Sequence, residues 1–158
     1  AEARIRRMAL NYDSMPAGND NQVVTISKRK DLTAKLEVMV NYIAQHYRED
    51  VNLADVARET NLHPNYASSL FKKACGLGMN MYCNRLRVTH AQRLLATTSE
   101  KVGIIASEVG FHSLSRFYEA FESICKCSPN VYRRRIWSSG NTIEKTEVKH
   151  GNKAGDEK

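Results

Sequence analysis

The amino-acid sequence predicts an all-α fold in which one short helical unit occurs twice. Three observations support this prediction. Apolar residues recur at helical spacing from Asp31 to Trp137. Within that range proline occurs only at Pro64 and Pro129, where each is suited to begin a helix. The chain also matches itself when it is shifted by 49 to 50 residues.

Composition places the chain among ordinary globular proteins, with 158 residues, 42% hydrophobic and 26% charged. No stretch approaches the roughly 20 consecutive apolar residues of a membrane span. No short apolar run follows a basic start at the N-terminus, so export is not expected. A cytoplasmic location without a membrane partner is therefore expected. Lysine and arginine number 24 against 17 acidic residues, and the resulting charge of +7 favours polyanions as partners.

The four cysteines are too few for a disulfide scaffold and are expected to be reduced, partly buried thiols. A zinc site would have to combine Cys125 and Cys127 with a histidine, either His112 or His90. The Cys-Lys-Cys spacing lacks the two-to-four-residue loop of structural zinc sites, so no metal or other cofactor is expected.

Both ends of the chain are interpreted as lying outside the folded domain. Residues 1–30 lead through Pro16 and a polar Asn-rich stretch, which is typical of a linker, and residues 23–26 are left unassigned because a lone strand has no partner. The chain opens with Ala rather than Met, which suggests that it starts inside a longer protein. Residues 138–158 predict a disordered polar tail, so the domain is expected over 31–137.

The first elements of the domain follow from local patterns. An opening amphipathic helix is predicted by apolar residues spaced at i, i+3, i+4 and i+7, namely Leu36, Met39, Val40, Ile43 and Tyr47. Asn52 is then expected to cap a short second helix, with Asp55 three residues later in an arrangement close to a capping box. This helix should end near Thr60.

The internal repeat divides the rest of the domain into two helix-turn-helix units, the first over about 52–75 and the second over about 101–125. A connecting helix is expected over about 79–98. In each unit a small residue lies mid-helix, where a following helix must cross closely, and a residue that tolerates left-handed backbone comes at the turn. An apolar residue then fills the corner. These pairs are Ala57 and Ala106, Asn61 and Gly110, and Leu62 and Phe111.

The second helix of such a unit can lie in the major groove of DNA. Two copies in one basic chain predict a sequence-specific DNA-binding protein that reads two successive major-groove segments about 10 bp apart. Straight B-DNA seats two such helices poorly, which predicts DNA bending or weak engagement by one unit. The alternative is a helical protein-interaction module, whose complexes would be far less salt-sensitive than those with DNA. An enzyme is not expected, because the sequence contains no phosphate loop, HExxH pair or nucleophile elbow.

The connecting helix, the second unit and the helix after it carry a specific set of residues: Arg85, Leu86, Ala91, Leu94, Leu95, Thr98, Ile105, Ala106, Val109, Gly110, Phe111, Ser113, Ser115, Arg116, Phe117, Phe121 and residues 128–133. With this set, residues 31–136 resemble the DNA-binding domain of the AraC/XylS family of bacterial transcription regulators. The resemblance implies seven helices with two helix-turn-helix units held by a central helix. It also implies promoter DNA and RNA polymerase as partners, activation rather than repression, and a small-molecule effector acting through a separate upstream domain. Residues 1–30 would be the junction to that domain.

Four positions depart from the family pattern. Lys101 and His63 stand where the family often has serine, so both helix starts are expected to lose their usual cap. Gly103, near the start of the fifth helix, is expected to destabilise that helix by up to about 1 kcal/mol relative to alanine. Lys126 stands where many members have glycine.

The side chains expected to read bases lie on the polar faces of the two recognition helices, namely Asn65, Ser68, Ser69 and Lys72 in the first and Leu114, Ser115, Arg116 and Glu119 in the second. Arg116 is the main candidate, because a guanidinium can fork onto guanine O6 and N7. Its alternative roles are a phosphate contact or a salt bridge to Glu119 or Glu122. Phosphate contacts are expected from side chains at helix ends and on exposed faces: His63, Tyr66, Lys73, Arg85, Arg87, Lys101, Ser113, Lys126, and one or two of Arg133, Arg134 and Arg135.

Overall fold

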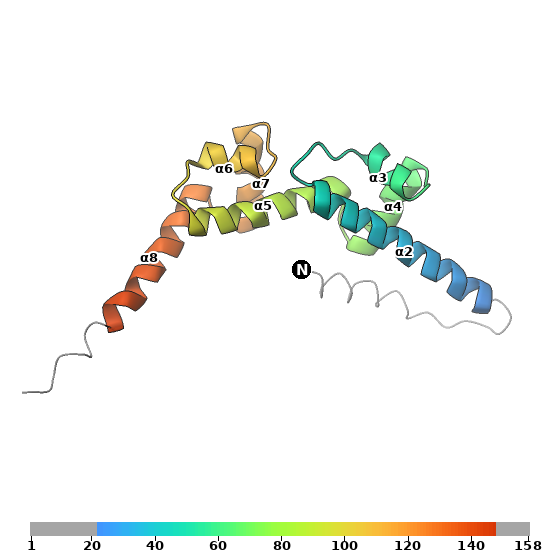
Figure 1. Ribbon diagram of the computed structural model, residues 1–158, viewed down its shortest axis with the longest axis horizontal. Coiled ribbons are helices and arrows are strands. Elements are labelled where there is room, and N and C mark those ends of the chain that lie inside the picture. The colour runs from blue at the N-terminus through green and yellow to red at the C-terminus, as the bar shows by residue number, and fades with distance from the viewer. Residues whose placement is uncertain (1–21, 148–158) are drawn as a thin grey trace, which may run out of the picture. The chain divides into compact units, whose positions relative to one another are not determined.

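The computed structural model of the chain describes residues 22–147, so the expected junction before residue 22 and the tail after residue 147 lie outside the described residues. The described residues form seven α-helices and no strand, as predicted (Figure 1). None of these helices is long and apolar enough to cross a membrane. The helices are α2 (Gln22–His46), α3 (Leu53–Glu59), α4 (Pro64–Cys75), α5 (Met79–Thr97), α6 (Val102–Glu108), α7 (Leu114–Cys125) and α8 (Pro129–Glu147).

The first described helix starts earlier than predicted. Residues 22–30 belong to α2, whereas the sequence interpretation assigned them to a linker and left 23–26 unassigned. No proline or glycine interrupts this segment, and the Thr33 hydroxyl donates to the Arg29 carbonyl at 2.9 Å within the helix. The boundary was misplaced because the amphipathic pattern marks only the part of α2 that packs in the core.

The last helix also ends later than predicted. α8 continues to Glu147, past the expected domain end at Trp137. The segment after Trp137 contains one glycine and no proline, and a single glycine costs a helix only about 1 kcal/mol. The polar composition of this segment predicted a disordered tail, but such a composition is also compatible with a helix.

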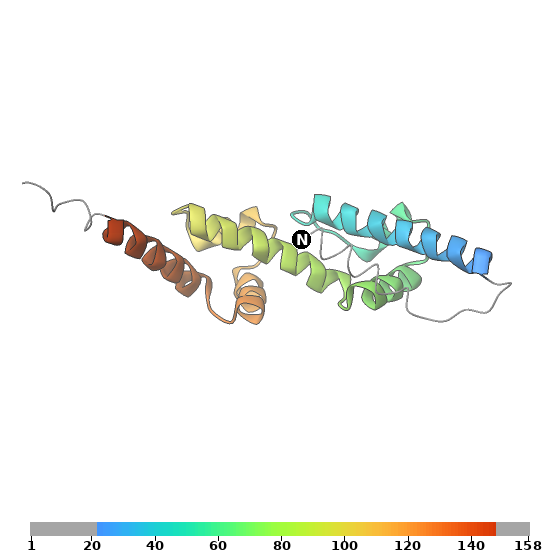
Figure 2. The same ribbon diagram turned by 90° about the horizontal axis from the view of Figure 1, so that it is seen from below.

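The described helices form two compact units, divided between Leu86 and Arg87, and each unit has its own core. α2, α3 and α4 pack together in the first unit, and in the second α7 packs against both α6 and α8. α5 is drawn in Figure 2 as one continuous helix, coloured green to yellow. It supplies Cys83 to the first core and Val88, Ala91 and Leu95 to the second. Its apolar residues form no single stripe because its two halves pack in different cores.

The two helix-turn-helix turns both contain a residue with a positive φ angle and share a hydrogen bond, as the repeat predicted. Asn61 and Gly110 adopt positive φ angles of 52° and 97°. The next residue, Leu62 or Phe111, donates its N–H to the carbonyl of the alanine five residues earlier, at 3.0 and 2.9 Å. That alanine is buried in both units, so the closely crossing helices leave room for a methyl group only.

The helix caps agree with the sequence in part. The Asn52 Oδ1 accepts the Asp55 N–H at 2.9 Å as predicted, and Lys101 provides no side-chain cap. The expectation that His63 fails to cap α4 is wrong, because its Nδ1 accepts the Asn65 N–H at 3.3 Å in the manner of an Asx oxygen. Ser113 occupies the N-cap position of α7, but its hydroxyl makes no cap hydrogen bond, because position alone does not set the rotamer.

A left-handed residue ends each recognition helix, Gly76 at φ 73° and Lys126 at φ 58°. Replacing Lys126 with glycine should raise the free energy of unfolding by about 0.5 to 1 kcal/mol. Relief of the left-handed strain, about 1 to 2 kcal/mol, exceeds the entropy that glycine adds to the unfolded chain, roughly 0.5 to 1 kcal/mol. Urea denaturation followed by circular dichroism measures the change.

Gly76→Ala is the matched control for this prediction. A Cβ added at Gly76 meets no atom within 4 Å, so no steric clash adds to the backbone terms. The substitution should destabilise the protein by about 0.5 to 1 kcal/mol, which is the left-handed strain less the entropy that alanine removes from the unfolded chain. An unchanged or lower stability in Lys126→Gly would contradict the strain argument.

Candidate nucleic-acid interface

α4 turns one side to the first core and the other to solvent. Ala67 and Phe71 are fully buried, since each has 0% of its surface exposed. This packing fixes the rotation of α4 about its own axis, so the predicted base-reading side chains lie on the side that faces away from the core. Asn65, Ser69 and Lys72 are exposed, Ser68 is half-buried, and Tyr66 is 49% exposed.

α7 is oriented in the same way in the second unit. Phe117 and Phe121 are buried, with their rings 5.6 Å apart. The four predicted base-reading side chains are exposed: Leu114, Ser115, Arg116 and Glu119. Within the described residues Arg116 forms no salt bridge with Glu119 or Glu122, so its guanidinium remains available to a ligand.

Most of the side chains expected to contact phosphates are exposed to solvent. The exposed members are His63, Tyr66, Lys73, Arg85, Lys101, Lys126, Arg134 and Arg135, and Ser113 is half-buried. Arg87 differs, because its guanidinium lies over the Phe111 ring at 5.4 Å from the centroid. A cation–π contact of this kind orients the side chain at the corner of the second unit.

Arg133 is also held within the protein. Its Nη2 donates to the Glu100 carbonyl at 2.5 Å, and its Nε is buried without a hydrogen-bond partner in the described structure. This side chain connects α8 to the segment that leads into α6. Arg134 is the exposed member of the pair, and its guanidinium is better placed for a phosphate.

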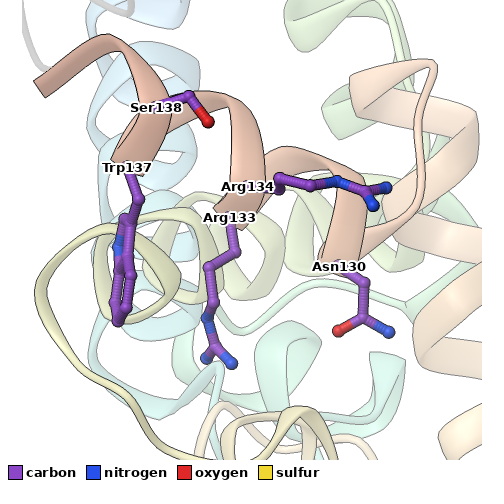
Figure 3. Close-up of a pocket in the computed structure, with 5 residues that line it drawn as sticks. All are labelled: Asn130, Arg133, Arg134, Trp137 and Ser138. Carbon is purple, nitrogen blue, oxygen red and sulfur yellow. The ribbon is translucent and has the colours of Figure 1, made fainter. Parts of the chain in front are cut away.

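A shallow groove of about 390 Å³ runs along α8 (Figure 3). Arg133 and Trp137 project from the same side of the helix there, one turn apart. Sequence reasoning took Trp137 as the end of the domain and missed this position, although its spacing from Arg133 already indicated a shared helix face. The groove is lined by Asn130, Arg133, Arg134, Trp137 and Ser138.

Three of the cysteines pack in the two cores, Cys75 and Cys83 in the first and Cys125 in the second. All four are free thiols, and Cys83 is buried. Burial raises the pKa of the Cys75 thiol and is the main reason why the pKa of Cys125 is also raised. Such thiols stay protonated and make poor nucleophiles. No group of three His, Cys, Asp or Glu side chains between residues 22 and 147 is arranged to hold a metal ion.

Comparison with known families identifies this arrangement. The sequence profile described as a helix-turn-helix domain matches residues 56–135, half of the chain, from α3 into α8. The chain belongs to the AraC-type helix-turn-helix family. This family comprises DNA-binding transcription regulators and not enzymes. The predicted all-α fold with two helix-turn-helix units is confirmed.

Two curated relatives are similar to this AraC-type domain. The chain is 36% identical over 103 residues to the regulatory protein PocR of Salmonella typhimurium, which covers 65% of this chain and 34% of the relative. It is 35% identical over 96 residues to the melibiose operon regulatory protein of Escherichia coli, with 61% and 32% covered. The chain thus spans about a third of the length of the curated relatives it matches.

A solved structure has the same fold. The DNA-binding domain of the global transcriptional factor AdpA, in complex with a target DNA, aligns at a TM-score of 0.62 with 24% identity. The alignment covers 66% of this chain and 95% of that domain.

Proposed function

We propose that this AraC-type chain is the DNA-binding part of a transcription regulator and reads one major-groove segment with each recognition helix. The observation that carries the proposal is that each recognition helix buries one side in its core and leaves a largely polar side exposed, and that each follows a turn with a positive φ angle. The related fold bound to its target DNA supports it.

The two recognition helices differ in charge, and we propose that one contributes more to DNA affinity and the other more to discrimination between bases. α4 has Lys72 and Lys73 in its last turn, whereas α7 has no basic residue there and carries Glu119 and Glu122. Phosphates attract the first helix and repel the acidic part of the second. The first unit therefore supplies more of the affinity, and Arg116 in the second unit supplies discrimination.

The bases are read by Asn65, Ser68, Ser69, Lys72, Leu114, Ser115, Arg116 and Glu119 in this proposal. The phosphates are held chiefly by exposed cations, since Arg87 and Arg133 are partly engaged within the protein. The family resemblance supports activation of promoters in the cytoplasm through contact with RNA polymerase. It also supports control by a small-molecule effector that binds a region outside the AraC-type domain.

Selection of bound duplexes from a random pool, at two salt concentrations, tests the proposed function. We expect two short blocks about one helical turn, some 10 bp, apart. Salt-sensitive binding without a motif would contradict sequence-specific readout. Absence of binding would favour the protein-interaction module instead.

The charge difference leads to a prediction about Glu122, an exposed residue on α7. Glu122→Lys should raise DNA affinity by about 3- to 10-fold and steepen the salt dependence by about one ion, because a repelled carboxylate becomes a cation near phosphates. Fluorescence anisotropy over a salt series measures both. Glu37→Lys on α2 is the control, with the same change of charge outside both recognition helices, and an equal gain there would refute a local effect.

A further inference from the structure

The two recognition helices correspond residue by residue at an offset of 50. Each has 12 residues. The left-handed residue after each helix, Gly76 or Lys126, donates its N–H to the carbonyl four residues earlier at 2.9 Å. The helices therefore end at equivalent positions.

Side-chain packing confirms this correspondence. Phe71 meets the Tyr82 ring edge-on at 5.4 Å and an interplanar angle of 80°. Phe121 meets Tyr132 in the same way, at 5.6 Å and 80°. The rings in each pair lie at the same helix positions in both units, so an offset of 50 holds through the recognition helix and beyond.

This register pairs Tyr66 with Arg116. Each directly precedes a fully buried residue, Ala67 in one unit and Phe117 in the other. Each side chain is exposed to solvent. Sequence reasoning assigned Tyr66 to a phosphate and Arg116 to a base because it compared residue types and not equivalent positions.

The Tyr66 side chain is available to a ligand. It is 49% exposed, and none of the described residues gives it a hydrogen bond or a ring contact. An exposed aromatic ring on a recognition helix presents apolar surface to the groove. The apolar group that base pairs display in the major groove is the 5-methyl of thymine.

We propose that Tyr66 is a specificity-determining residue that contacts a thymine methyl in the segment read by α4. The proposal rests on the proposed function, because it requires α4 to enter the major groove. It assigns Tyr66 to the same role as Arg116, with an apolar contact in place of a guanidinium fork.

Deoxyuridine substitution in the selected duplex tests the contact, since it removes only the methyl group. Each thymine of the block read by α4 is replaced in turn, and affinity is measured for the full chain. We expect one replacement to weaken wild-type binding by about 5- to 10-fold. The Tyr66→Ala protein should bind the unmodified duplex about 5- to 10-fold more weakly than the wild type. Its affinity should no longer change when deoxyuridine replaces the contacted thymine.

Tyr66→Phe separates the two roles of the side chain. It keeps the ring and removes the hydroxyl, so the thymine contact predicts retained sensitivity to deoxyuridine, whereas a phosphate hydrogen bond predicts weaker binding to every sequence. The latter result, or a Tyr66→Ala protein with unchanged thymine preference, would overturn the proposal. If the wild-type chain selects no motif at all, the proposed function fails with it, and the two failures are thereby distinguished.

Discussion

Replacing Phe121 with alanine should lower the free energy of unfolding by about 3 to 5 kcal/mol. The ring is fully buried and contacts Phe117 and Tyr132, both at 5.6 Å between centroids. Truncation removes these contacts and leaves a cavity in the core that supports α7. Because domains are stable by only about 5 to 15 kcal/mol, this is a large share of the total. Urea denaturation followed by circular dichroism measures it.

The conservative variant Phe121→Leu is the control. It retains most of the buried volume and should cost less, about 1 to 1.5 kcal/mol. A loss below about 1 kcal/mol in Phe121→Ala would show that the second core closes around the cavity. Such closure would also change the packing that fixes the orientation of α7 and its exposed face.

Arg116→Ala should cost about 1 to 3 kcal/mol of discrimination at one base pair of the second block. The arginine is exposed on α7 and forms no salt bridge with another described residue, so its planar fork is available to guanine O6 and N7. Competition between the selected duplex and a duplex altered at that base pair measures the loss. Binding to unrelated DNA should change little.

Arg116→Lys distinguishes base reading from phosphate binding. Lysine keeps the charge but not the bidentate geometry, so it should preserve the salt dependence and lose the discrimination. If Arg116→Lys instead retains discrimination and Arg116→Ala only reduces the salt slope, Arg116 contacts a phosphate. Arg134→Ala provides the comparison, since we expect that exposed cation to affect the salt slope alone.

The two turns and the start of α3 were predicted well because their signals are local. Asn61 and Gly110 adopt the left-handed backbone that their residue types permit, and Asn52 caps α3 through a residue three positions away. The two misplaced helix boundaries also have a cause in the local sequence. The polar start of α2 and the polar end of α8 carry no core-facing pattern, so amphipathicity could not place them.

The functional positions depended more on contacts between distant residues. Arg87 and Arg133 look like ordinary surface cations in the sequence, yet one lies over Phe111 and the other donates to Glu100, 33 residues away. The offset of 50 that pairs Tyr66 with Arg116 was already present in the sequence repeat, and the buried rings confirm it; the structure adds that both side chains are exposed.

The sequence by itself determined the all-α class and the two helix-turn-helix units, because these depend on periodicity, turn residues and an internal repeat within short stretches of chain. The family was indicated by the resemblance of specific residues in the connecting helix, the second unit and the helix after it. Only the tertiary structure decided which cations are already engaged and which side chains share an equivalent exposed position. The physical reason is that burial and long-range contacts orient each helix about its axis, and that orientation is a property of the packed core.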